Sequence, residues 1–227
     1  GVVIKTYMAW PSPAPTDASR AAVAIYDANR GLSNLAMDLA RRFAKEGYVA
    51  VAPDLLSRTG RASSDMDPEE TRAAFASIST ERKALDMAAA LDFTSGHPAV
   101  DDRKLAAIGF CASGEIVWRL ATVYPKLRAA APFYGSNPPL SDVPNIRAAV
   151  FAVYGDLDRF VNPGIPDIEA ALNAAGTTYR SKIYPNSPHS FFDDYRPGDY
   201  NPDTAAEAWF DTLNWFAEHM DLPTPWM

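Results

Sequence analysis

The chain has 227 residues, of which 48% are hydrophobic and 22% charged, which predicts one globular domain spanning residues 1–227. Its formal net charge of −7 argues against a surface that binds nucleic acid or an anionic membrane. No apolar run reaches the length of a transmembrane helix, and a single cysteine cannot form an internal disulfide.

The chain begins at Gly1 rather than at a methionine, inside a strand-like stretch over residues 2–10. No signal peptide is visible, so we expect a soluble, cytoplasmic protein, and a removed N-terminal targeting segment is the open alternative. The prolines at 11, 13 and 15 predict a broken connection after this strand. The sequence leaves the oligomeric state open.

Short apolar stretches then alternate with helical patterns along the rest of the chain. Strands are expected at 21–26, 48–52, 105–108, 129–134, 148–154 and 179–184. Helices are expected at 34–46, 81–94, from 112 onward, at 166–175 and at 204–219. This alternation predicts the α/β class, with a mostly parallel central sheet and helices on both of its faces.

Two details of this prediction concern the region before residue 95. Residues 57–70 are polar and contain Gly60 and Pro68, so they are interpreted as a long surface loop. In the following helix, Leu85, Ala88, Ala89 and Phe93 are expected to form the buried face.

The most informative stretch surrounds the single cysteine. Gly109-Phe-Cys111-Ala-Ser113-Gly114 follows an apolar strand and precedes a helical pattern. Small residues at these offsets are typical of a nucleophile elbow, where Cys111 replaces the usual serine and Ser113 replaces the last glycine. The N-terminus of a helix favours thiolate, and the N–H of Ala112 would point at a developing oxyanion.

An elbow requires an acid and a histidine, and both follow in the order found in α/β-hydrolases. Asp158 and His189 each come shortly after a predicted strand, so they would meet Cys111 at the carboxyl edge of the sheet. His189 would act as base and acid, and Asp158 would orient its ring. Asp156 competes with Asp158 but is interpreted as a turn residue beside Gly155.

The other histidines and other site classes are less favoured. His97 lies in a turn and is expected to face solvent, and His219 is expected to be a favourable charge at a helix C-terminus. One cysteine and three scattered histidines provide no close pair of metal ligands, so no metal is expected. Glycine-rich nucleotide-binding motifs are absent.

With these residues assigned, the chain resembles the dienelactone hydrolase family, the carboxymethylenebutenolidases, over nearly its whole length. The matching motifs are NRGL at 29–32, EGYVAVAPDL at 46–55, GFC at 109–111, PFYG at 132–135, Asp158 with Val161, Tyr184-Pro, His189-Ser-Phe, and AAEAW at 205–209 with the residues that follow. The resemblance implies an α/β-hydrolase fold, a Cys–His–Asp triad, no cofactor, and hydrolysis of a small lactone or ester. It also implies that the second oxyanion donor is the N–H of Asn29.

The resemblance implies further roles at positions where this chain departs from the family. A glutamate usually stands directly before the NRGL stretch and contacts the resting cysteine, but this chain has Ala28, preceded by Asp27. Either Asp27 substitutes for that glutamate or His189 activates Cys111 unaided. Arginines bind the substrate carboxylate in the family, which points to Arg72 and to Arg196, although Asp193 and Asp194 precede the latter.

The leading hypothesis is therefore a cysteine-dependent hydrolase of lactones or small carboxylic esters that acts through a thioester acyl-enzyme. A binding or structural member of the same fold, with decayed catalysis, is the alternative. A cysteine peptidase fits less well because nothing in the sequence indicates an extended peptide groove. The sequence does not identify the substrate.

Overall fold

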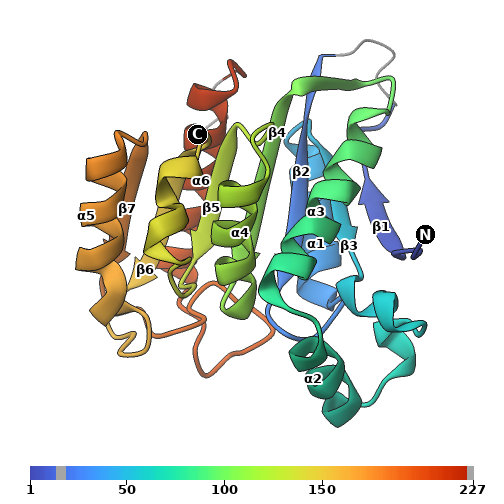
Figure 1. The fold of residues 1–227 in the computed structure, drawn as a ribbon, viewed down its shortest axis with the longest axis horizontal. Helices are drawn as coiled ribbons and strands as arrows, with labels where there is room; N and C mark the ends of the chain where they lie inside the picture. Colours follow the sequence, from blue (N-terminus) through green and yellow to red (C-terminus); the bar gives the residue numbers. More distant parts are fainter. Residues whose placement is uncertain (14–18, 224–227) are drawn as a thin grey trace.

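The computed structural model describes residues 1–13 and 19–223. Seven strands form one sheet in the order β1-β3-β2-β4-β5-β6-β7, in which β1 runs antiparallel to β3 and all other neighbours are parallel (Figure 1). The strands are β1 (Thr6–Ala9), β2 (Arg20–Asp27), β3 (Val49–Pro53), β4 (Val100–Phe110), β5 (Ala129–Phe133), β6 (Ala149–Gly155) and β7 (Tyr179–Tyr184). The first strand is shorter than the predicted 2–10, and residues 14–15 of the proline-rich connection lie outside the described residues.

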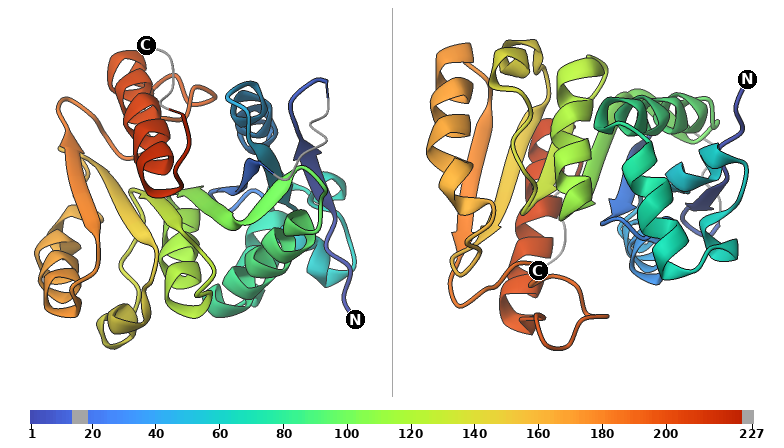
Figure 2. Two further views of the ribbon diagram at one scale, coloured as in Figure 1. Left: turned by 90° about the horizontal axis from the view of Figure 1, so that it is seen from above. Right: turned by 60° about the horizontal axis from the view of Figure 1, so that its bottom comes forward.

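Helices cover both faces of the sheet, as predicted. They are α1 (Asn34–Lys45), α2 (Pro68–Ser77), α3 (Thr80–Ser95), α4 (Ala112–Val123), α5 (Ile165–Ala175) and α6 (Pro202–His219). Figure 2 shows α1 and α6 on one face and α3, α4 and α5 on the other, each layer closing one of two apolar cores. The strands from β2 to β6 are largely buried on both faces, which explains their short runs of alanine, valine and isoleucine. This is the α/β-hydrolase architecture.

The predicted surface loop over 57–70 is wrong. Residues 55–77 form two short 3-10 helices, Leu55–Thr59 and Ser63–Asp65, followed by α2. The α2 helix begins with a capping box, in which the Asp67 carboxylate accepts from the Glu70 N–H and the Glu70 carboxylate accepts from the Asp67 N–H. Pro68 occupies the first helical position, where its missing N–H costs nothing. The segment projects beside the carboxyl ends of the strands (Figure 1).

Of the predicted buried face of α3, Ala88 is buried, but the prediction is wrong for Leu85, Ala89 and Phe93. Leu85 and Phe93 are exposed, whereas the charged Lys83 and Asp86 are buried. Asp86 accepts hydrogen bonds from two arginines, and Lys83 donates to the carbonyl of Phe75 and lies over its ring. The side of α3 that packs into the core is formed by Ala84, Met87, Ala88 and Leu91, which have the spacing of one helix face.

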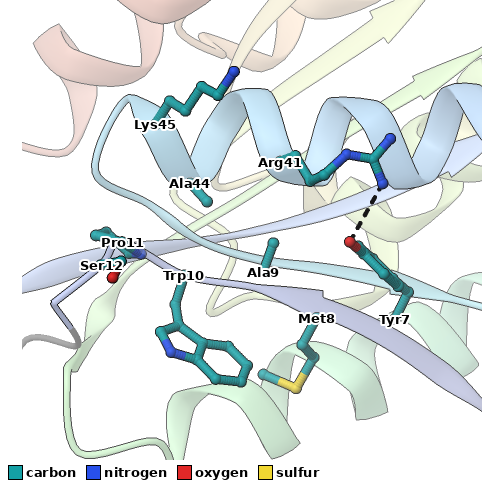
Figure 3. Close-up of a pocket in the computed structure, with 9 residues that line it drawn as sticks. All are labelled: Tyr7, Met8, Ala9, Trp10, Pro11, Ser12, Arg41, Ala44 and Lys45. Carbon is teal, nitrogen blue, oxygen red and sulfur yellow. Dashed lines mark hydrogen bonds between the residues drawn. The ribbon is translucent and has the colours of Figure 1, made fainter.

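A groove of about 640 Å³ lies between β1 and α1 (Figure 3). Met8 and Trp10 point to one side of β1, while Tyr7 points to the other and its hydroxyl accepts a hydrogen bond from Arg41. The pairing of Ala9 with Ala50 places this groove toward the beginning of β3. It is therefore at the opposite end of the sheet from the carboxyl ends of the parallel strands.

Candidate active site

Cys111 occupies the turn between β4 and α4 with a backbone φ of 57° and ψ of −123°. A positive φ is strained for a residue with a side chain, and here it projects the thiol from the carboxyl end of the sheet. The strand and helix approach so closely that a Cβ on Gly109 would overlap the carbonyl oxygen of Ser113. Only glycine fits at this position, which is the physical reason for the small-residue spacing of the motif.

Asp158 and His189 meet at the same edge of the sheet. The His189 Nδ1 lies 2.5 Å from an Asp158 carboxylate oxygen, and the Asp158 side chain is fully buried. Because Asp158 occupies Nδ1, Nε2 is the ring nitrogen available to Cys111. The structure thus brings together three residues that are 31 or more positions apart in the chain.

The interaction between His189 and Asp158 changes the pKa of both residues. Burial disfavours protonation of the His189 ring, but its hydrogen bond with Asp158 and the adjacent Cys111 side chain raise its pKa to about 9. Burial acts to raise the pKa of Asp158, but the hydrogen bond from His189 and the N–H groups of Phe160 and Val161 bring it below its usual value. The site therefore favours an imidazolium held by a carboxylate.

The sequence predicted secondary roles for Asp156, His219 and His97. The structure agrees with the prediction for Asp156 and differs from it for the two histidines. Asp156 accepts the N–H of Ser187 and lies in a turn, as expected. His219 packs against Trp215 with ring centroids 4.1 Å apart, and burial lowers its pKa, so it does not act as the expected favourable charge. His97 does not simply face solvent, because its Nδ1 accepts the Ala99 N–H at 3.2 Å.

The loop after β2 approaches the nucleophile from the other side. The hydroxyl of Ser113 donates to the carbonyl of Ala28 at 2.7 Å, which joins this loop to the first turn of α4. Within the described chain, the N–H groups of Ala112 and Asn29 donate to no protein acceptor. Unpaired N–H groups of this kind are the donors that an oxyanion hole needs.

The Asp27 carboxylate is hydrogen-bonded at the start of α1. Its side chain accepts from the Ser33 hydroxyl at 2.7 Å, and Ser33 in turn caps α1 through the N–H of Ala36. Burial raises the pKa of Asp27 to about 6, since the Ser33 hydrogen bond offsets the desolvation only in part. Asp27 therefore anchors the start of α1.

The two arginines expected to bind substrate occupy different settings. Arg72 lines a cavity of about 480 Å³ together with Asn29 and Arg30, with Ser63, Met66, Pro68 and Thr71 completing its wall. Arg196 instead bonds the hydroxyl of Ser190 and pairs with Asp199 at 2.8 Å. Arg72 thus shares a cavity with Asn29, one of the two oxyanion candidates.

Three contributors were not identified from the sequence. Tyr134 has a φ of 37° and packs its ring 5.0 Å from that of His189, and its buried hydroxyl has no partner among the described residues. Ser113 supplies a hydrogen bond, although the sequence indicated only that it is small. Phe160 follows the acid and packs edge-on against His189. In the sequence, only the position of Phe160 two residues after Asp158 indicated that it could lie near the site.

No helix within residues 1–13 and 19–223 is long and apolar enough to cross a membrane. In the same described ranges, no three His, Cys, Asp or Glu side chains are grouped so that they could hold a metal ion.

Known proteins resemble this chain over almost its full length. A sequence model of the dienelactone hydrolase family matches residues 4–220. A candidate carboxymethylenebutenolidase from Yersinia pestis is 32% identical over 201 residues, which cover 83% of this chain and 74% of that protein. One from Methylorubrum extorquens is 29% identical over 232 residues, which cover 96% of this chain and 77% of that protein.

Among solved structures, a candidate dienelactone hydrolase from Klebsiella pneumoniae superposes with a TM-score of 0.80 at 26% identity, covering 95% of this chain and 99% of the other. The family model and this superposition agree over nearly the whole fold, from β1 to α6. The chain belongs to the dienelactone hydrolase family.

Proposed function

We propose that this protein is a cysteine-dependent hydrolase of lactones or small carboxylic esters that acts through a thioester acyl-enzyme. The observation that carries the proposal is the 2.5 Å contact between His189 Nδ1 and buried Asp158, with Cys111 beside the same ring at a strained elbow. Family membership supports a hydrolase, and this arrangement supports the nucleophile.

The first half of the reaction forms the thioester. His189 takes the thiol proton, and the Cys111 sulfur attacks the carbonyl carbon of the substrate. The carbonyl oxygen becomes an oxyanion that accepts hydrogen bonds from the N–H groups of Ala112 and Asn29. When the intermediate collapses, the bond to the leaving oxygen breaks and His189 returns the proton to that oxygen.

The second half hydrolyses the thioester with a water molecule. His189, again neutral, takes a proton from the water, whose oxygen attacks the thioester carbonyl. Collapse of this intermediate releases the carboxylic acid and returns the proton to the Cys111 sulfur. Asp158 holds the ring in one tautomer and stabilises its cation in both halves, which agrees with the raised pKa of about 9 of His189.

The departures at positions 27 and 28 favour activation of Cys111 by His189 alone. Asp27 is bonded to Ser33 and Ala28 cannot exchange a proton, so neither reproduces the family's glutamate. For substrate binding, we propose that Arg72 and Arg30 receive a polar or anionic group in the cavity beside Asn29. Asp27 and Arg196 are assigned to the scaffold of the site.

The decayed-member alternative predicts a slow-reacting cysteine and no turnover. The test measures iodoacetamide labelling near neutral pH and hydrolysis of p-nitrophenyl acetate in the wild type, Cys111→Ala and Cys111→Ser. We expect stoichiometric labelling of the wild type with parallel loss of activity, no turnover by Cys111→Ala, and poor turnover by Cys111→Ser because a hydroxyl needs a stronger base. Activity of Cys111→Ala near the wild-type level would refute the nucleophile.

A further inference from the structure

Phe160 is an exposed aromatic residue beside the candidate triad. Its side chain is 86% exposed, more than any other large apolar residue of the described chain. Its N–H donates to an Asp158 carboxylate oxygen at 2.9 Å, while the other oxygen of the same carboxylate bonds His189. One carboxylate therefore bonds both the histidine ring and the backbone from which the Phe160 side chain projects.

The Phe160 ring lies against the histidine rather than against the protein core. The ring centroids of Phe160 and His189 are 6.1 Å apart with planes at 81°, an edge-to-face contact. The same loop exposes a second apolar side chain, Leu157, which is 58% exposed. Large apolar side chains held at the rim of a reactive site are available to cover an apolar part of a ligand.

The chemistry of the proposed reaction indicates which part of the substrate this is. His189 delivers its proton to the leaving oxygen, so the alcohol portion of the ester must lie next to the imidazole ring. The carbonyl oxygen meets the oxyanion donors on the side of the loop after β2, where Asn29 lines a cavity together with Arg30 and Arg72. The two sides of the scissile bond thus meet different surfaces.

We propose that Phe160 is a specificity residue that binds the leaving group, and that the preferred substrates are esters whose alcohol portion is apolar or aromatic. This inference rests on the proposed function. It assigns the apolar selectivity of the site to the loop after β6 rather than to the oxyanion side.

The test compares three esters with the wild type and Phe160→Ala. Benzyl acetate carries a phenyl ring on the leaving group, ethyl phenylacetate carries it on the acyl group, and ethyl acetate has none. Loss of contact with one aromatic ring is expected to lower kcat/KM for benzyl acetate roughly tenfold, mainly through KM. The values for ethyl acetate and ethyl phenylacetate are expected to fall by less than about threefold.

Two controls separate specificity from structural damage. Phe93→Ala removes a similarly exposed phenylalanine from α3, outside the site, and should leave all three values unchanged. Phe160→Leu should recover most of the benzyl acetate activity because it restores apolar area. The iodoacetamide labelling rate of Phe160→Ala should match that of the wild type, which reports an intact Cys111 and His189.

Each other outcome overturns the assignment. An equal loss with all three esters means that Phe160 only holds the triad, and a selective loss with ethyl phenylacetate means that it contacts the acyl group. A concentration-dependent dimer that dissociates on Phe160→Ala means that the ring serves an interface. Absence of turnover of any ester by the wild type would instead refute the proposed function.

Discussion

Two buried aspartates flank the elbow, and their acidities move in opposite directions. Asp158, after β6, bonds His189, and its pKa is lowered. Asp27, at the end of β2, accepts from the neutral Ser33 hydroxyl, and burial raises its pKa to about 6. Both carboxylates lie at the carboxyl edge of the sheet, yet their acidities differ. The hydrogen-bond partner of each carboxylate, and not its place in the sheet, therefore decides its role.

The comparison extends to the loops that carry these residues. The loop after β6 meets the loop after β7 through the Asp158–His189 contact, which serves the proposed chemistry directly. The loop after β2 is instead fixed by Ser33 and by the bond from Ser113 to Ala28, which leaves the N–H of Asn29 free of acceptors among the described residues. One region supplies reactive side chains, and the other supplies an ordered backbone.

The largest expected effect comes from neutralising each aspartate in turn. Asp158→Asn should lower kcat by roughly a thousandfold or more, because an amide no longer selects the productive tautomer of His189. Asp27→Asn should change kcat by less than about threefold, because the oxygen of the new amide can still accept from Ser33. Steady-state hydrolysis of p-nitrophenyl acetate by both variants checks this, and comparable losses would mean that Asp27 takes part in the chemistry.

The second prediction concerns the pH dependence of the free energy of unfolding, which should change in opposite directions in the Asp27 and Asp158 variants. A raised pKa means that folded Asp27 binds its proton more tightly than the unfolded chain does, so this stabilisation is full below pH 3.8 and lost as pH rises through about 6. Above pH 6 the buried anion destabilises the fold. Asp27→Asn should therefore raise the free energy of unfolding at pH 8 by about 1–2 kcal/mol, and by much less at pH 4.

Asp158 supplies the contrast for that measurement. Its lowered pKa stabilises the folded state above pH 3.8, and this contribution is lost as pH falls through the folded pKa. Asp158→Asn should destabilise the protein near neutral pH, and the difference should shrink in acid. Denaturant unfolding at a series of pH values distinguishes the two variants, and parallel pH profiles would contradict the distinction.

The next effect tests the tie between the elbow and the β2 loop. Ser113→Ala removes the 2.7 Å hydrogen bond to Ala28 and leaves a carbonyl unpaired, which should cost about 1–2 kcal/mol of stability. Activity should fall several-fold because the N–H of Asn29 loses its fixed position. Ser95→Ala, which removes an exposed bond to a backbone carbonyl, is the matched control and should change neither quantity measurably.

The smallest effect concerns the missing glutamate. Ala28→Glu places a carboxylate near Cys111 and should slow iodoacetamide labelling a few-fold, because an added anion opposes formation of thiolate. Ala28→Gln has the same size without the charge and controls for strain at the positive φ of 47°. Identical labelling rates for the Glu and Gln variants would mean that position 28 does not face the thiol.

Much of the fold and of the candidate site could be predicted from the sequence, because the strands and the elbow have recognisable patterns of neighbouring residues. Parallel strands buried on both faces appear as brief apolar runs, and Gly109 is dictated by the close passage of strand and helix. The meeting of Cys111, Asp158 and His189 follows from the common edge at which parallel strands end.

The failures have a different physical origin. The α2 helix has a readable capping box at Asp67 and Glu70, but only Thr71 of that helix is buried, so apolar periodicity was absent. On α3 two apolar patterns overlap, and the structure buries the one formed by Ala84, Met87, Ala88 and Leu91 while Leu85 and Phe93 stay exposed. The position of Phe160 depends on a bond from its backbone to Asp158, which only the folded loop creates.

The most direct test of the central claim, that Cys111 carries the acyl group, is mass spectrometry of the enzyme quenched in acid during turnover of p-nitrophenyl acetate. The wild type should gain the mass of one acetyl group on the peptide that contains Cys111, and base or hydroxylamine should remove it as expected for a thioester. Asp158→Asn should gain the same adduct more slowly, and Cys111→Ala should gain none there. An acetyl group on another residue, or turnover with no adduct and no burst of p-nitrophenol, would contradict the account.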